Sequence, residues 1–238
     1  MARERKDAEK VRVLVVFAHP DDAEFTSGGT LARWASEGRK VSYAVLSDGS
    51  RGSDDGQVTN EELVARRKAE QCEAAGVLGV NDVIFIGRKD GEIVADDALK
   101  AELVCLIRGL KPEILLTWDP WRPYQLHSDH RASGQAALDA VMAAGNTRYF
   151  PEQLRDGQVP HQVEEIYLFG TDNPDHWVDI SDTFSRKIEA ISRHASQVAD
   201  IAKIEKEIGS WNRSLGKRKG FAYAEAFKVI NPVCEICR

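Results

Sequence analysis

The chain has 238 residues, with 32 lysines and arginines against 38 aspartates and glutamates, for a formal net charge of −6. This length is enough to bury a full hydrophobic core as one domain, and the acidic balance gives no electrostatic footprint for a nucleic acid. No apolar run approaches the ~20 residues that a membrane-spanning helix needs. We therefore expect a single globular domain without a nucleic-acid or membrane partner.

The two ends of the chain differ in composition from the rest. Residues 1–10 are charged almost throughout and lack the apolar stretch of a signal peptide or anchor, so we expect a disordered tail and a cytoplasmic protein. Residues 11–230 are expected to form the folded domain, and residues 231–238 a C-terminal tail. This second tail contains Cys234 and Cys237, whose spacing suits a metal-binding or disulfide pair, or two free thiols at a frayed end.

Apolar runs and helical patterns alternate along the chain. Strands are expected at 13–18, 40–46, 83–86, 114–118 and 163–169, with a short extended segment at 177–180 and a return to the sheet at 222–230. Helices are expected at 30–37, 59–75, from 96 or 97 to 110, at 130–144, from 181 or 182 to 194, and onward to 211. This alternation predicts an α/β fold, a Rossmann-like three-layer sandwich with a mostly parallel central sheet in a single domain.

The first predicted strand ends in a cluster of polar side chains. His19, Asp21, Asp22 and Glu24 follow it directly. Ligands bind just beyond the carboxyl ends of strands in open α/β sheets, and three carboxylates so close together repel one another unless a cation or solvent screens them. A single His-x-x-Asp is more often ordinary turn chemistry, so this cluster alone does not establish a metal site.

A second cluster follows the strand predicted at 114–118. It contains His127, Asp129 and His130. If the two clusters meet at one edge of the sheet, His19 and His130 would supply two imidazoles and the first cluster a carboxylate. Three protein ligands with a position left for water are typical of a catalytic zinc site. The spacing in the sequence leaves open whether the clusters meet.

Several segments resemble one known family. Residues 18–24 (Ala-His-Pro-Asp-Asp-Ala-Glu), with Gly-Gly-Thr at 28–30, resemble the opening motif of the LmbE-like (PIG-L) zinc-dependent de-N-acetylases. Residues 127–131 resemble the family's second motif, with Ser128 where proline is usual. Residues 223–227 (Tyr-Ala-Glu-Ala-Phe) resemble the terminal segment of the soluble bacterial thiol-cofactor deacetylases. The likeness extends over roughly residues 11–230, one domain on ordinary size expectations.

The resemblance implies a function and a set of site residues. It implies removal of the acetyl group from a small N-acetylglucosamine-type substrate, with one zinc ion per chain or another divalent transition metal in its place. The implied metal ligands are His19, Asp22 and His130. The implied general base is Asp21, and a protonated His127 would stabilise the oxyanion. Asp129 would orient an imidazole, and Arg51 would bind substrate. The role of Glu24 stays open, and the sequence permits a homo-oligomer.

Proteins with other functions would share parts of this pattern. An amidase of the same fold acting on another acyl amide, such as a thiol conjugate, would use the same ligands, whereas a sugar- or metal-binding relative without catalysis would need neither Asp21 nor His127. A nucleotide-binding protein is disfavoured because the spaced Gly-x-Gly-x-x-Gly fingerprint is missing. Three aromatic residues near the second cluster could stack on a sugar or pack at a rim: Trp118, Trp121 and Tyr124. Three histidines lie outside any motif and are expected to be ordinary: His161, His176 and His194.

Overall fold

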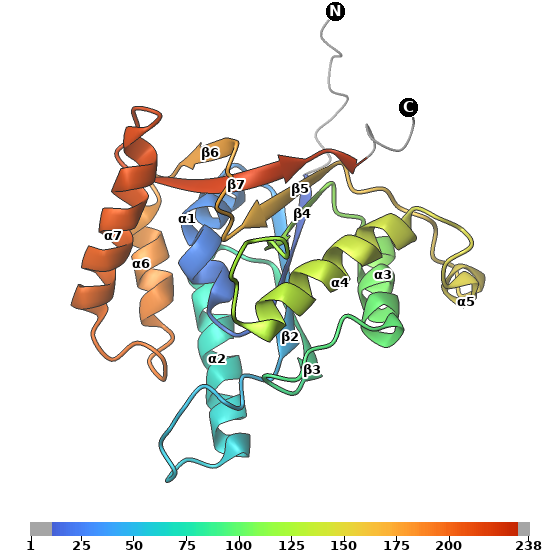
Figure 1. Ribbon diagram of the computed structural model, residues 1–238, viewed down its shortest axis with the longest axis horizontal. Coiled ribbons are helices and arrows are strands. Elements are labelled where there is room, and N and C mark those ends of the chain that lie inside the picture. Colours follow the sequence, from blue (N-terminus) through green and yellow to red (C-terminus); the bar gives the residue numbers. More distant parts are fainter. Residues whose placement is uncertain (1–10, 233–238) are drawn as a thin grey trace, which may run out of the picture.

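The computed structural model describes residues 11–232, so the predicted tail at 1–10 and the pair Cys234 and Cys237 lie outside the described residues. A seven-stranded sheet lies between two layers of helices (Figure 1). The strands are β1 (Arg12–Phe17), β2 (Lys40–Ser47), β3 (Asp82–Arg88), β4 (Ile114–Trp118), β5 (Glu165–Phe169), β6 (His176–Asp179) and β7 (Ala224–Ile230). The helices are α1 (Asp22–Ser36), α2 (Asn60–Leu78), α3 (Asp97–Leu110), α4 (Ser128–Ala144), α5 (Pro151–Arg155), α6 (Phe184–Ser192) and α7 (Ile201–Lys217).

The strand order in the sheet is β3-β2-β1-β4-β5-β7-β6. Strands β1 to β5 pair in parallel, and β7 runs antiparallel to both β5 and β6. The predicted α/β fold with a mostly parallel sheet is therefore confirmed. From β1 the chain builds the sheet outward through β2 and β3, and then returns to place β4 on the other side of β1. This reversal is a topological switch point, where open sheets of this kind leave a crevice.

Each face of the sheet is covered by its own group of helices. Phe17 and Tyr43 belong to the core under α1, α2 and α6, whereas Leu14 and Val16 belong to the core under α3 and α4 (Figure 1). Because β1 is buried on both faces, its sequence is apolar without alternation, as expected for the centre of a parallel sheet.

Most helix boundaries follow from local chemistry, with one informative exception. Helix α2 begins with a capping box: the Thr59 hydroxyl accepts from the backbone N–H of Glu62, whose carboxylate accepts from the N–H of Thr59. The first helix was expected to begin at Thr30 but begins at Asp22, so the two glycines at 28 and 29 lie inside it. Gly-Gly has low helix propensity, and tertiary packing overrides that preference here.

Later boundaries differ by smaller amounts. Helix α6 is preceded by Thr183 rather than by Ser181 or Asp182, and α7 continues to Lys217, beyond the expected end at 211. Within residues 11–232, none of the helices combines the length and the apolar character needed to cross a membrane.

Candidate active site

The two sequence clusters meet at the switch point. Strands β1 and β4 are parallel neighbours, so the loops that follow them leave the same edge of the sheet. The first loop carries His19 into α1, and the second carries His127 and His130 into α4. The ring centroid of His19 lies 4.5 Å from that of His127 and 5.2 Å from that of His130.

Asp22 lies between the imidazoles of His19 and His130. Its Oδ2 accepts hydrogen bonds from the backbone N–H groups of Ala18 (3.1 Å) and His19 (2.9 Å) and from the indole N–H of Trp118 (3.0 Å). The same oxygen is 3.6 Å from Nδ1 of His19, and Oδ1 is 3.4 Å from Nε2 of His130. Burial disfavours the carboxylate, but the hydrogen bonds from the two imidazoles outweigh it and hold the pKa of Asp22 well below its ordinary value.

The other nitrogen of His19 faces two carboxylates. Its Nε2 lies 3.2 Å from Oδ1 of Asp90 and 3.2 Å from Oδ2 of Asp129. Asp129 is completely buried and also accepts from the backbone N–H groups of Gly91 (2.7 Å) and Ile93 (3.3 Å), so its orientation is fixed. A carboxylate that accepts from one imidazole nitrogen leaves the lone pair on the other nitrogen for a metal, as is usual for metal-binding histidines. In His19 that second nitrogen is Nδ1, on the side of Asp22.

The region favours positive charge. Burial opposes a charge on His19, but the hydrogen bonds and negative charges of Asp22 and Asp90 outweigh burial and raise the pKa of His19 to about 10. The same negative field would attract a metal cation.

The donor atoms present fit a divalent transition metal. The distances of 3.4 and 3.6 Å from the Asp22 oxygens to the two imidazoles are close to the ~3.4 Å between ligand atoms of a tetrahedral site with bonds of ~2.1 Å. Among the described residues, two groups have ligand atoms that all lie within 4.8 Å of one another, and neither group includes Asp22. One group consists of the three imidazoles of His19, His127 and His130. The other consists of His19 and the carboxylates of Asp90 and Asp129. All of these sets share His19, and imidazole with carboxylate suits zinc and its neighbours.

Asp21 adopts a backbone conformation that is unusual for a residue with a side chain. Its φ is 109°, in the left-handed region, which costs on the order of 1–3 kcal/mol and needs support from its surroundings. Helix α2 supplies that support: the Gln71 side chain accepts from the Asp21 N–H (2.8 Å), and Nη2 of Arg67 contacts both the Pro20 carbonyl (2.7 Å) and Oδ2 of Asp21 (3.3 Å). The conformation turns the Asp21 carboxylate into the cavity beside Asp22.

The acidity of Asp21 differs from that of its neighbour. Burial and the charge of Asp22 raise the pKa of Asp21 to about 7, against the opposing charge of Arg67. A carboxylate with a pKa near neutrality can exchange protons readily at physiological pH.

His127 stands at the rim of the site, at the N-cap of α4. Its ring is exposed and stacks on that of His130, with 4.4 Å between the centroids. Burial, together with the charges of His19 and His130, lowers the pKa of His127. The protonated form of His127 stays a prediction, and the ring donates through at least one N–H in either form.

A cavity of about 350 Å³ opens beside these groups. Arg51 lines it and contacts Oε1 of Glu92 through Nη2 at 2.5 Å, while its backbone N–H donates to Asp90. The complete lining is His19, Asp21, Arg51, Gly52, Arg67, Asp90, Gly91, His127, His130 and Gln197.

Three residues that support this site are not among those predicted from the sequence. Asp90 follows the carboxyl end of β3, so the same strand-end rule that selected His19 would have found it. Arg67 and Gln71 lie in the middle of α2, where a polar residue is normally solvent-exposed, yet both are buried. No local pattern distinguishes them from surface residues of an amphipathic helix.

Glu24 and His194 form a buried pair behind the site. Oε2 of Glu24 lies 3.3 Å from Nε2 of His194, and neither side chain is exposed. Oε1 of Glu24 accepts from the Gln71 amide at 3.1 Å, and Gln71 in turn holds Asp21. His194, which carries no motif and was expected to be ordinary, therefore belongs to the network that supports Asp21.

The aromatic residues near the second cluster divide into two kinds. Trp118 is buried and stacks on His130 with 3.9 Å between centroids, in addition to its bond to Asp22, so it packs against the site rather than offering a face to a sugar. Trp121 and Tyr124 are 62% and 95% exposed.

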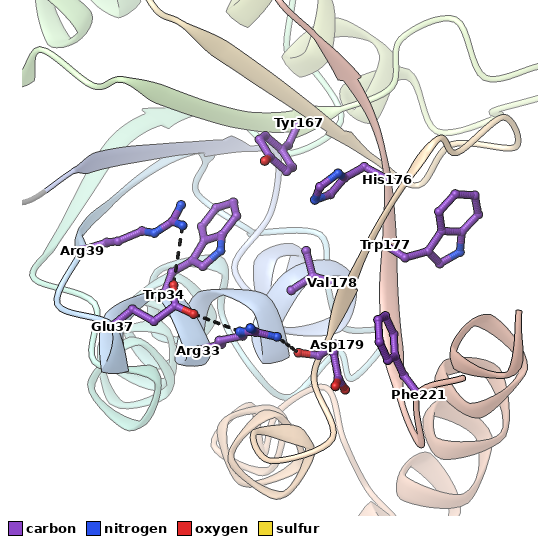
Figure 2. Close-up of a pocket in the computed structure, with 10 residues that line it drawn as sticks. All are labelled: Arg33, Trp34, Glu37, Arg39, Tyr167, His176, Trp177, Val178, Asp179 and Phe221. Carbon is purple, nitrogen blue, oxygen red and sulfur yellow. Dashed lines mark hydrogen bonds and ion pairs between the residues drawn. The ribbon is translucent and has the colours of Figure 1, made fainter. Parts of the chain in front are cut away.

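A second cavity, of about 460 Å³, lies elsewhere (Figure 2). Trp34, Tyr167 and His176 line it, and the guanidinium of Arg39, which precedes β2, lies 4.5 Å from the Trp34 ring centroid. None of the predicted site residues lines this cavity, whereas His19, Asp21 and His130 line the cavity of about 350 Å³ at the switch point, which is therefore the candidate active site.

Comparison with known proteins agrees with this location. The family model described as PIG-L, GlcNAc-PI de-N-acetylase, matches residues 14–141, which contain both clusters. A diacetylchitobiose deacetylase from Thermococcus kodakarensis is 34% identical over 92% of this chain and 83% of its own length. A deacetylase from Rhodococcus jostii that acts on 1D-myo-inositol 2-acetamido-2-deoxy-α-D-glucopyranoside is 29% identical over 79% of this chain and 82% of its own.

A solved structure shows the same architecture. The N,N′-diacetylchitobiose deacetylase from Pyrococcus horikoshii superposes with a TM-score of 0.90 at 30% identity, covering 94% of this chain and 85% of its own. Motifs, fold and overall similarity agree over most of the described residues, and the chain accordingly belongs to the PIG-L (LmbE-like) family of de-N-acetylases.

Proposed function

We propose that the protein is a zinc-dependent hydrolase that removes the acetyl group from an N-acetylglucosamine-type sugar. The observation that carries this proposal is the position of Asp21: its carboxylate lies in the cavity beside the His19, Asp22 and His130 set, with its pKa raised to about 7. A binding site for metal or sugar alone would have no use for an acid–base group at that point.

His19, Asp22 and His130 would hold one zinc ion, and another divalent transition metal would fit the same donors. Asp22 is preferred to His127 as the third ligand because it is an anion and contacts both imidazoles, whereas His127 stands exposed at the rim. Zinc bound there would bring the pKa of a bound water toward ~7 and polarise the amide carbonyl.

The remaining groups would handle protons and developing charge. Asp21 would take the proton of the attacking water and return it to the departing amine, and its contact with Arg67 keeps it oriented for both steps. His127, protonated as expected from the sequence, would donate an N–H to the oxyanion of the tetrahedral intermediate. Asp129 would act through His19, whose Nε2–H it accepts.

The substrate class rests on the relatives and on the cavity. Two of the relatives are named for different glycosides that share an N-acetylated glucosamine unit. A cavity of about 350 Å³ is at the small end of ligand pockets and suits one such unit. Arg51 would bind a substrate hydroxyl or acyl oxygen, since its exposed pair with Glu92 contributes little and is readily exchanged.

The test is the release of acetate and free amine from N,N′-diacetylchitobiose and related N-acetylglucosamine glycosides by the purified protein. We expect turnover that is abolished by a chelator and restored by zinc. Full activity after complete removal of metal would refute the proposed chemistry. Activity confined to amides without an amino sugar would instead favour the alternative function, an amidase that acts on another acyl amide.

A further inference from the structure

A buried ion pair connects α6 and β7 to the backbone of α1. Nζ of Lys187 lies 2.6 Å from Oε1 of Glu225, and neither side chain has any exposed surface. Neither residue lines the cavity. Removing two charges from water is costly unless hydrogen bonds satisfy them, so the remaining partners of this pair indicate what it does.

Those partners are backbone groups in the middle of α1. Glu225 accepts from the N–H of Gly29 (3.0 Å) and the N–H of Thr30 (2.7 Å), and Lys187 donates to the carbonyl of Phe25 (2.8 Å). In an α-helix the carbonyl of residue 25 and the N–H of residue 29 are partners of each other. The ammonium thus contacts the acceptor of one helical hydrogen-bond pair, and the carboxylate contacts its donor.

The two glycines of the opening motif make this approach possible. A Cβ at Gly28 would lie 3.2 Å from Cγ of Lys187, and one at Gly29 would lie 2.7 Å from Cβ of Ile180. Any side chain at Gly29 would therefore push the segment before α6 away from α1. Glu225 belongs to the terminal motif, so two motifs at opposite ends of the chain are parts of one buried contact.

This contact lies one helical turn from the candidate catalytic residues. Phe25, whose carbonyl accepts from Lys187, donates its own N–H to the carbonyl of Asp21 at 3.2 Å. The N–H of Glu24 also donates to that carbonyl, at 3.0 Å. Asp22 is the first residue of α1 and Asp21 is its N-cap, so the placement of the first turn of α1 decides where the two carboxylates point.

We propose that Lys187 and Glu225 are positioning residues that set the first turn of α1 so that Asp22 meets the two imidazoles and Asp21 faces the cavity. Stability of the fold alone does not explain this ion pair, because replacing a buried ion pair with well-packed apolar residues is often neutral or stabilising. The inference builds on the proposed function, but its structural part can be tested separately from activity.

The test uses the double variant Lys187→Met/Glu225→Leu, which removes both charges and keeps most of the volume. In the metal-free protein, we expect the amides of Glu24 and Phe25 to exchange hydrogen about tenfold faster. Zinc affinity, measured by competition with a chelator, should fall by about 10–100-fold, as it does when partners outside the ligand set are lost. Lys187→Arg, which keeps a cation, should recover part of both effects.

Arg108→Met is the matched control. Arg108 is buried on the other side of the sheet, where it donates to carbonyls at the end of α4 and beyond, such as those of Ala144 and Tyr149. Its replacement should lower stability while leaving zinc affinity and the exchange of the Glu24 and Phe25 amides unchanged.

A folded double variant with wild-type amide exchange and wild-type zinc affinity would overturn the proposal. If the double variant does not fold, Glu225→Gln decides by the same two measurements, because it keeps the shape and one acceptor oxygen. A loss of zinc affinity in a protein whose wild type hydrolyses no N-acetylated sugar would leave the positioning role standing and reject the proposed function.

Discussion

The indole of Trp118 contacts Asp22 in a way that orients a candidate metal ligand. Its Nε1–H donates to Oδ2 at 3.0 Å, although β4 and α1 are separate in the chain. The backbone N–H groups of Ala18 and His19 donate to the same oxygen, so that Oδ1 is left to face His130. The carboxylate is therefore held in place before any cation arrives, which is how surrounding hydrogen bonds raise the affinity of a metal site.

Replacing Trp118 with Phe removes this hydrogen bond but keeps an aromatic ring against His130. We expect zinc affinity to fall by about 10-fold or more, with the fold retained, because one of three donors to Oδ2 is lost. Chelator competition measures the effect. Trp121→Phe, in an exposed position of the following loop, is the control and should bind zinc as the wild type does.

His19 is shared by every group of potential ligands in the site. His19→Ala should therefore abolish stoichiometric metal binding, as measured by elemental analysis after dialysis. His161→Ala removes an imidazole that bonds only to the Pro112 carbonyl among the contacts described, and it should leave the metal content unchanged. Equal metal content in the two variants would show that the ion binds elsewhere.

Asp21 and Asp22 are adjacent but should behave in opposite ways. Asp21→Asn should keep the metal and lower kcat by about 10²–10⁴-fold, because a general base is lost. Asp22→Asn should weaken the metal, since it replaces an anion beside a dication with a neutral amide. Metal content and kcat, measured for both variants, test these two roles. If Asp21→Asn loses the metal while Asp22→Asn keeps it, the two roles are reversed.

His127 distinguishes two ligand sets. His127→Ala should retain the metal and lose about 10²–10³-fold in kcat, the usual effect of removing one oxyanion donor. If the metal is lost instead, the three clustered imidazoles of His19, His127 and His130 form the ligand set and the role given to Asp22 is wrong. Zinc affinity and kcat should be measured on the same preparation.

Arg51 is proposed to contact substrate and not the metal. Arg51→Ala should lower kcat/KM by about tenfold, with most of the change in KM, because a charged hydrogen bond to substrate is lost. Glu92→Gln weakens the only ion pair described for the Arg51 side chain and should leave KM unchanged or lower it. A wild-type KM in Arg51→Ala would remove Arg51 from the substrate site.

Much of the fold could be predicted because the determining patterns are local. The apolar residues of β1 and β4 mark buried strands, and the capping pair of Thr59 and Glu62 marks the beginning of α2 within the chain itself. The beginning of α1 was predicted at the wrong residue because Gly28 and Gly29 were interpreted as the segment that precedes a helix. Their actual surroundings, Lys187 and Ile180, come from residues more than a hundred positions away.

By itself, the sequence determined the alternation of strands and helices, the chemical types gathered at two strand ends, and the family. These properties depend on neighbouring residues, whose periodicity and side-chain chemistry can be read directly. Only the tertiary structure decided that the clusters meet, because their meeting depends on β4 pairing with β1. Packing of distant elements likewise decided that Arg67 and Gln71 support Asp21 and that Glu225 reaches α1, since the burial of a polar side chain depends on what covers it.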